Sequence, residues 1–232
     1  MMLKICNYKI DITNELLFSL QKEQLNFLPW QNRWYQNRFL ENRSLKKARQ
    51  IGADYYFLFE ALQDACLTGR NKIFIGNIPI EYLLKHAGIK EFKAARTYIF
   101  NLSNGANIYV LNHEYFNDIP LGGIYGDVYI SEWSWIENLR DVVSLAGAFS
   151  AHDKWRVTIY TYRSKFDVSS RRGNSILCDS LLGRNYYYDL VQNSEYELGS
   201  LFLINHQKLN DWELMFTNQI AQEMIFCCSN DN

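Results

Sequence analysis

Apolar and polar residues alternate at the start of the chain. From Cys6 to Ile12 every second residue is apolar, and this spacing over residues 3–12 predicts a half-buried β-strand. Thr13 then offers the side chain of a helix N-cap, and the apolar residues after it predict a helix that ends before Pro29.

Helical spacing of apolar residues is clearest between Asp54 and Trp133. A short apolar run at 72–76 predicts a strand, and two later apolar runs around a glycine-containing loop predict a hairpin over 107–133. The predicted helices lie near 54–68, 79–88 and 90–103. The resulting order is helix, strand, helix, tight turn, helix and hairpin.

This order of elements resembles that of winged helix-turn-helix DNA-binding domains, in particular those of plasmid and phage replication or regulatory proteins. The segment that carries the resemblance is Lys72-Ile-Phe-Ile-Gly-Asn-Ile-Pro-Ile-Glu-Tyr-Leu-Leu-Lys-His-Ala-Gly-Ile-Lys-Glu-Phe-Lys-Ala-Ala-Arg96. The resemblance covers residues 53–133 and implies that the third helix enters the major groove while the hairpin contacts the DNA backbone or minor groove. The loop 117–125 departs from the pattern, because it contains Asp118 and no Lys or Arg.

Beyond residue 133 the pattern is less regular. It predicts a helix over 135–149, a strand over 155–163, one or two strands within 175–191 and a closing helix over 209–224. Together with the earlier elements, this predicts an α+β fold with a central winged-helix domain, flanking N-terminal helices, and a C-terminal antiparallel sheet plus helix.

No linker or low-complexity tract divides the sequence, so we expect continuous structure in three regions. The first, 1–52, would be an N-terminal strand and helices that pack on the core. The second, 53–133, would be the winged-helix-like domain, and the third, 134–232, a C-terminal α+β portion.

Composition excludes some classes of protein. Hydrophobic residues make up 48% of the chain, which excludes a wholly disordered protein. The 24 Lys and Arg nearly balance the 25 Asp and Glu, so a nucleic-acid coat protein is excluded and any basic surface must be local. The five cysteines lack a disulfide or zinc spacing, and no apolar run could form a signal peptide or cross a bilayer. We therefore expect a cytoplasmic protein with no metal, no cofactor and no membrane partner.

Two groups of residues have the chemistry of nucleic-acid contacts. The polar face of the third predicted helix carries the first group, Lys90, Lys93, Arg96, Thr97 and Asn101. The basic stretch 33–49, which is interleaved with aromatic residues, carries the second group, Arg33, Arg38, Arg43, Lys46 and Lys47. A solvated helix face would show the first group equally well, and core packing explains the aromatic residues Trp30 and Trp34 more simply than base stacking.

A weaker signal is a loop of hydroxyl, arginine and glycine residues at 169–174. Together with a nearby arginine it predicts an anion site formed by Arg163, Arg171 and Arg172. A hairpin tip in water would have the same composition.

Motifs for catalysis are not matched by the sequence. It has no GxxxxGK phosphate loop, no GxSxG elbow and no paired-histidine nuclease motif. The resulting hypothesis is a non-catalytic DNA-binding protein that acts in replication or transcription of a phage or other mobile element.

The alternative is a protein-interaction, inhibitor, immunity or self-assembling structural protein, with a protein partner or a second copy of itself. Its contact surface would be rich in aromatic residues, since these are enriched at interfaces. The residues expected on that surface are Tyr160, Tyr162, Tyr186 and Tyr188.

Overall fold

The computed structural model describes residues 3–114, 122–162, 181–182 and 186–191, together with 207, 211, 214 and 215. Eight strands form one sheet in the order β1-β4-β5-β3-β6-β7-β2-β8. All neighbouring pairs are parallel except β4 and β5, which are antiparallel. The strands are β1 (Leu3–Ile10), β2 (Asn42–Lys47), β3 (Lys72–Ile75), β4 (Ala95–Leu102), β5 (Asn107–Leu111), β6 (Asp127–Ser131), β7 (Val157–Thr161) and β8 (Tyr187–Val191).

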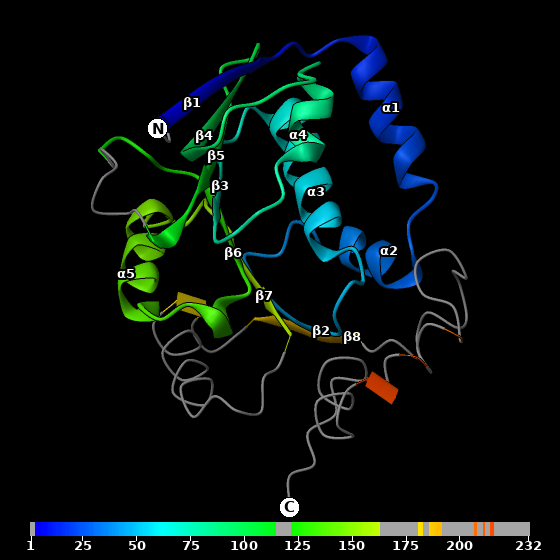
Figure 1. Cartoon of the computed structure of the whole chain (residues 1–232), viewed down its shortest axis with the longest axis vertical. Coiled ribbons are helices and arrows are strands. Elements are labelled where there is room, and N and C mark those ends of the chain that lie inside the picture. Colours follow the sequence, from blue (N-terminus) through cyan, green and yellow to red (C-terminus); the bar gives the residue numbers. More distant parts are fainter. Residues whose placement is uncertain are drawn as a thin grey trace, which may run out of the picture.

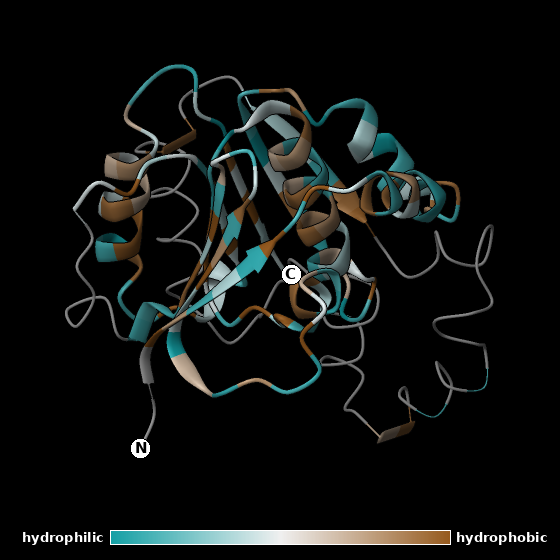
Figure 2. Cartoon of the chain, turned by 90° about the horizontal axis from the view of Figure 1, so that it is seen from above, coloured by the Kyte–Doolittle hydropathy of each residue, from teal (hydrophilic) through white to brown (hydrophobic). Residues whose placement is uncertain are grey.

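Helices cover both faces of this sheet (Figures 1 and 2). One face is covered by α1 (Asn14–Gln24), α2 (Pro29–Gln36), α3 (Ala53–Thr68) and α4 (Glu81–His86). The other face is covered by α5 (Leu139–Phe149), which follows a short 3-10 turn, η2 (Trp133–Trp135). The result is a three-layer α/β/α arrangement.

Successive side chains of the central strands point to opposite faces of the sheet and pack into two separate hydrophobic cores. Phe74 and Tyr129 pack with the helices α1 to α4, and the neighbouring Ile73 and Ile130 pack with α5. The strands are buried on both sides because a mostly parallel sheet needs helices on both faces.

A buried ion pair connects β2 to α3. The guanidinium of Arg43 donates to both carboxylate oxygens of Glu60, at 2.9 and 2.5 Å, and both side chains are almost fully buried. Thr158 on β7 accepts two further hydrogen bonds from Arg43, and the hydroxyls of Tyr56 and Tyr129 donate to Glu60. This network therefore fixes β2, β6 and β7 against α3.

A second buried network closes the amino ends of the central strands. Lys72 at the start of β3 is bonded to Asp64 and to Asp127, which begins β6. Arg156 also bonds both carboxylates, and Arg70 bonds Asp127. Burial alone would raise the pKa of Asp127, but Arg70, Lys72 and Arg156 hold it well below its usual range.

The structure corrects the predicted α+β winged-helix fold. Residues 90–103 do not form a recognition helix: β4 occupies most of this range, because it pairs with β1 from the distant N-terminus and with β5. The predicted hairpin over 107–133 is also wrong, because β3 lies between β5 and β6 and is parallel to both. The expected C-terminal antiparallel sheet is wrong as well, since β7 and β8 are both parallel to β2.

Several individual elements are confirmed. The expected strand at 3–12, the helix near 54–68 and the strand at 72–76 correspond to β1, α3 and β3. Thr13 caps α1 as predicted, with its Oγ1 accepting from the Leu16 amide at 3.1 Å. The sheet takes strands from all three regions of the sequence. The closing helix over 209–224 falls almost wholly outside the described residues. In the described part, no helix is long and apolar enough to span a bilayer.

The second network predicts a large stability cost for Asp127→Asn. Lys72 and Arg156 would then share the single carboxylate of Asp64, and Arg70 would lose its carboxylate partner. Uncompensated buried charge of this kind costs about 3–5 kcal/mol. Urea unfolding of the variant and of the exposed control Asp153→Asn would measure the difference. The control should lose less than about 0.5 kcal/mol, and equal losses in the two variants would contradict the assignment.

A pH-dependent contribution to stability is expected from Glu23 on α1. Partial burial would raise its pKa, but the nearby His86 imidazole and hydrogen bonds from the hydroxyls of Tyr82 and Tyr55 lower it to about 2. Because an unfolded Glu titrates near about 4.3, the stabilisation is present above that pH and is lost as the pH falls towards the folded-state pKa. The excess unfolding free energy of the native chain over Glu23→Gln should therefore shrink on acidification, and a constant difference would refute the assignment.

Candidate functional site

Three neighbouring strands end at the same edge of the sheet. In the order β6-β7-β2 all three are parallel, so their carboxyl ends meet there. Ligands of open parallel α/β sheets bind outside this edge. We refer to the surface formed by residues 47–54, 131–132 and 161–162 as the carboxyl edge.

The turn from β2 to α3 supplies backbone donors at the carboxyl edge. Gln50 and Gly52 have positive φ angles of 58° and 74°, with Ile51 between them. Alternation of this kind turns successive amides inward and forms an anion-binding concavity. The first amides of α3 have no partner within the helix, and the helix dipole makes this end positive. Arg49 in the same turn is exposed.

Asp54 lies in the first turn of α3 and faces the end of β6. Its Oδ1 accepts hydrogen bonds from Ser131 Oγ at 3.1 Å and from the buried hydroxyl of Tyr160 at 2.8 Å. Gly76 packs behind this contact, because a Cβ there would lie 2.9 Å from the Ser131 carbonyl oxygen. The position of Ser131 is thereby restricted from two sides.

Glu132 follows β6 directly and is held across the end of β7. Its Oε1 lies 2.5 Å from Nζ of Lys47, the last residue of β2. Its Oε2 accepts from the Tyr162 amide at 3.1 Å and from Thr161 Oγ1 at 3.3 Å. Glu132 has a φ of 48°, and left-handed conformations of non-glycine residues occur preferentially at functional sites.

The donor set of the carboxyl edge fits a phosphate-bearing ligand and its magnesium ion. Amides of the β2–α3 turn, Lys47 and Arg49 provide the positive partners for phosphate. Asp54, Ser131 and Glu132 provide hard oxygen donors, which Mg²⁺ prefers. The described residues contain no group of three or more His, Cys, Asp or Glu side chains that could hold a metal ion by themselves. Sparse protein ligation is typical of Mg²⁺ that arrives with substrate phosphates.

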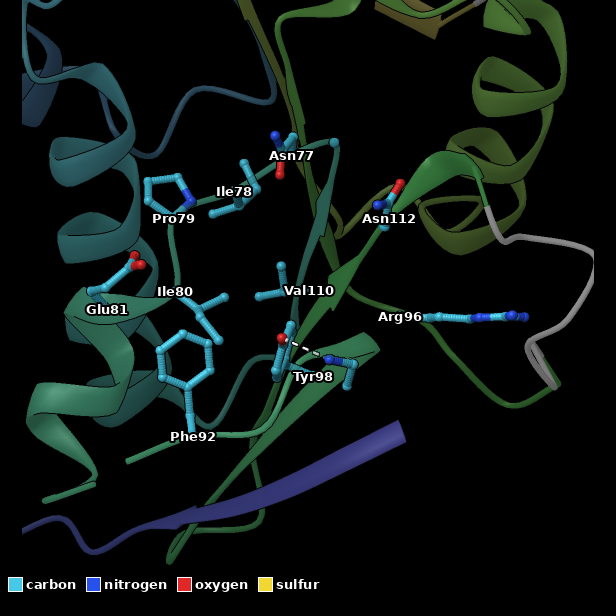
Figure 3. A pocket seen from close by; sticks show the side chains of 12 residues that line it. Asn77, Ile78, Pro79, Ile80, Glu81, Phe92, Arg96, Tyr98, Val110 and Asn112 are labelled. Carbon is cyan, nitrogen blue, oxygen red and sulfur yellow. Dashed lines mark hydrogen bonds between the residues drawn. The ribbon is translucent and has the colours of Figure 1, made fainter. Parts of the chain in front are cut away.

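A cavity of about 370 Å³ adjoins this edge beyond Gly76. Figure 3 shows it between the end of β3, the segment leading into α4 and the start of β4. Asn77, Asn112 and the half-exposed Phe92 line it, and the Ala95 amide donates to the Tyr98 hydroxyl at 2.9 Å. Arg96 extends away from Phe92 in this view.

The predicted nucleic-acid residues are distributed over several surfaces. From the first group, Lys90 and Lys93 are exposed in the segment before β4, Arg96 lines the cavity, Thr97 is buried, and Asn101 donates to the Tyr8 carbonyl. From the second group, only Lys47 reaches the carboxyl edge. Arg43 is in the buried pair with Glu60, Arg33 is paired with Asp189, Arg38 lies over the rings of Tyr35 and Phe39, and Lys46 lies 5.9 Å from the ring of Tyr188.

Other predicted residues have mixed outcomes. Trp30 and Trp34 are buried, as the core interpretation predicts. Tyr160 is fully buried rather than exposed, because its ring packs on Phe57 and its hydroxyl bonds Asp54. The predicted anion site at Arg163, Arg171 and Arg172 lies outside the described residues.

Comparison with known proteins identifies phage terminases as relatives. The chain is 37% identical over 142 residues to the "Probable terminase, ATPase subunit" of Haemophilus phage HP1 and 30% identical over 140 residues to the "Terminase, ATPase subunit" of Escherichia phage P2. Each match covers 57% of this chain and 23% of the relative, so the matched segment spans about a quarter of the relatives' length. No protein-family model matches the chain.

Solved structures of the large terminase from a thermophilic bacteriophage are also similar. One has a TM-score of 0.58 at 14% identity, covering 86% of this chain and 53% of the terminase. A second, in complex with ADP, has a TM-score of 0.52 at 13% identity, covering 92% and 52%. The chain has the fold of the matched half of that terminase.

These findings overturn four earlier interpretations. The resemblance to winged-helix proteins is wrong, because the relatives and structural neighbours are terminases. The hypothesis of a non-catalytic DNA-binding protein is wrong, and so is the protein-interaction alternative, because both relatives are ATPase subunits. The preference for a protein without enzymatic activity, which was based on the lack of a catalytic motif, is contradicted for the same reason.

Sequence reasoning missed Asp54, Ser131 and Glu132 as members of a site. Asp54 was noted only as the start of a helical pattern, and a search for GxxxxGK could not detect a turn in which Gly52 is followed by Ala53. The detectable signal was a pair of features: a glycine turn leading into a helix, and an apolar strand that ends in Ser131-Glu132.

The packing behind Ser131 predicts a destabilising effect of Gly76→Ala. Both Gly76 and Gly69 have positive φ angles, but a Cβ at Gly69 meets nothing within 4 Å. Gly69→Ala should therefore cost only the backbone strain, while Gly76→Ala adds a clash with Ser131 of about 1–3 kcal/mol. Chemical unfolding of the two variants would measure this, and an equal cost for both would contradict the close packing of β3 on the end of β6.

Proposed function

We propose that the chain is an ATP-hydrolysing module of a phage terminase and that the carboxyl edge is its nucleotide site. The observation that carries the proposal is the position of Glu132. Its carboxylate is held by Lys47 at the entrance to the β2–α3 turn and by the end of β7. A carboxylate is thus fixed beside an anion-binding turn, as hydrolysis of a phosphate anhydride requires.

The comparisons support this proposal. The two sequence relatives are terminase ATPase subunits, and one structural neighbour of the same fold is a complex with ADP. The arrangement of β2, β7 and β6 also brings the turn and Glu132 to one edge, where nucleotides bind in open α/β sheets.

In the proposed site, amides of the β2–α3 turn and the start of α3 bind the phosphates. The GxxxxGK[ST] motif adds a lysine after its last glycine, but Ala53 stands there in this chain. Lys47 and Arg49, on either side of Ala48, are the cations that flank the turn. We propose that they supply the positive charge that Ala53 cannot.

Glu132 is the proposed general base. Its two oxygens are positioned by Lys47, Thr161 and the Tyr162 amide, so the carboxylate has a defined orientation before substrate arrives. Glu132 would orient a water molecule for in-line attack on the terminal phosphate and accept its proton. Mg²⁺ bound with ATP would neutralise the negative charge that develops on the phosphate oxygens.

Terminases act on phage DNA together with other packaging components, and we propose DNA and protein partners for this chain as well. Lys90 and Lys93, exposed before β4, are the candidate phosphate contacts among the described residues that sequence reasoning singled out. They lie beside the cavity that adjoins the carboxyl edge, since Phe92 between them lines it.

Replacement of the proposed base tests this function. Glu132→Gln keeps the size and hydrogen-bonding shape of the side chain but removes the basic carboxylate, so ATP hydrolysis should fall by about 10²–10⁴-fold. Nucleotide binding should persist. Phosphate release with purified protein measures the effect, and the exposed Glu137→Gln is the matched control. Hydrolysis that Glu132→Gln leaves unchanged would overturn the proposal.

A further inference from the structure

Two side chains at the proposed nucleotide site have exchanged their usual places. In a phosphate-loop site, a Ser or Thr hydroxyl from the start of the helix binds Mg²⁺, and its carboxylate partner comes from the end of a strand. In this chain the first turn of α3 carries the carboxylate, Asp54, and the end of β6 carries the hydroxyl, Ser131. The site therefore keeps one carboxylate and one hydroxyl, but each comes from the other element.

We infer that Asp54 supplies, from helix α3, the carboxylate that binds the Mg²⁺ of the nucleotide, and that Ser131 on β6 is its positioning partner. This inference rests on the function proposed above. It adds that the carboxylate for Mg²⁺, which in the phosphate-loop pattern comes from the end of a strand, comes here from a helix.

The geometry of the pair supports the exchange. Ser131 Oγ and the Tyr160 hydroxyl both donate to Oδ1 of Asp54, at 3.1 and 2.8 Å. Within the described part of the chain no other hydrogen bond reaches the Asp54 carboxylate, so Oδ2 is available to a ligand. The two donors hold the carboxylate in one orientation, and Gly76 limits the movement of Ser131 from behind.

Electrostatics makes the exchange testable. A hydroxyl at the start of the helix is neutral, whereas Asp54 places a negative charge beside the amides that would bind phosphate. Without Mg²⁺ this charge repels the phosphates, and with Mg²⁺ between them the same charge attracts the complex. Nucleotide affinity should therefore depend strongly on Mg²⁺, and Asp54 should be the cause.

The test measures binding of a fluorescent N-methylanthraniloyl derivative of ADP to the whole chain, in Mg²⁺ and in EDTA. Asp54→Asn should weaken binding roughly tenfold in Mg²⁺ and strengthen it in EDTA, because the repulsion is removed. Asp153→Asn removes an exposed carboxylate that precedes β7 and lies away from the carboxyl edge, so it is the matched control and should preserve both affinities.

A merely structural Asp54 would give a different result. If the residue only anchors α3 to the sheet, Asp54→Asn would lower the melting temperature and weaken binding equally in Mg²⁺ and EDTA, which would overturn the inference. If the native chain binds the nucleotide in neither condition, the proposed function itself fails.

The exchanged double variant guards against misfolding of the single variants. Asp54→Ser combined with Ser131→Asp restores one carboxylate and one hydroxyl in the usual places. It should recover the Mg²⁺ dependence that Asp54→Asn loses. Failure of the folded double variant to regain any Mg²⁺ dependence would contradict the exchange.

Discussion

The bidentate pair between Arg43 and Glu60 joins β2 to α3 under nearly complete burial. Hydroxyls from β6, β7 and α3 complete its hydrogen bonding, so the elements that carry the carboxyl edge share one polar centre. A buried charge is tolerated only when it is paired and hydrogen-bonded. Because loss of either partner would leave the other uncompensated, the relative positions of β2, β6, β7 and α3 depend on this contact.

Charges at the two ends of the central strands serve different purposes. At the amino ends, Lys72 and Asp127 belong to a cluster whose members satisfy one another. At the carboxyl ends, Lys47 is buried, but its partner Glu132 keeps 30% of its side chain exposed. The first network stabilises the strand order, whereas the second leaves the Glu132 carboxylate accessible to a ligand. The turn after β2 adds backbone donors at the second end alone.

Elements with local signals could be predicted from the sequence. The cap at Thr13, the apolar face of α3 and the apolar run of β3 depend on neighbouring residues, and all were predicted correctly. Strand β2 could not be recognised, because its Arg43 and Lys47 are buried only through partners far away in sequence. The range of β4 was predicted to be helical because its apolar spacing fits both the helical and the strand period. Its pairing with β1 determines that it is a strand. The candidate site was missed for a related reason. Asp54 and Ser131 are 77 residues apart in sequence, and they form a site only because the sheet brings them together.

The order of strands in the sheet also affects how the chain can be synthesised and folded. Strands β1, β4, β5, β3 and β6 are complete once residue 131 has been made, and they are contiguous in the sheet. Strand β2 appears early, at residues 42–47, but its two neighbours are β7 and β8, which end at residues 161 and 191. Pairing between strands so far apart in sequence is slow, because the entropy of closing the intervening loop is lost before any stabilising contact forms. During synthesis, β2 therefore cannot pair with a neighbouring strand, and so cannot hold the β2–α3 turn in place, until more than a hundred further residues have been added. Arg43 cannot complete its hydrogen bonds to Thr158 until β7 has been made, and the carboxyl edge is among the last parts of the sheet to form.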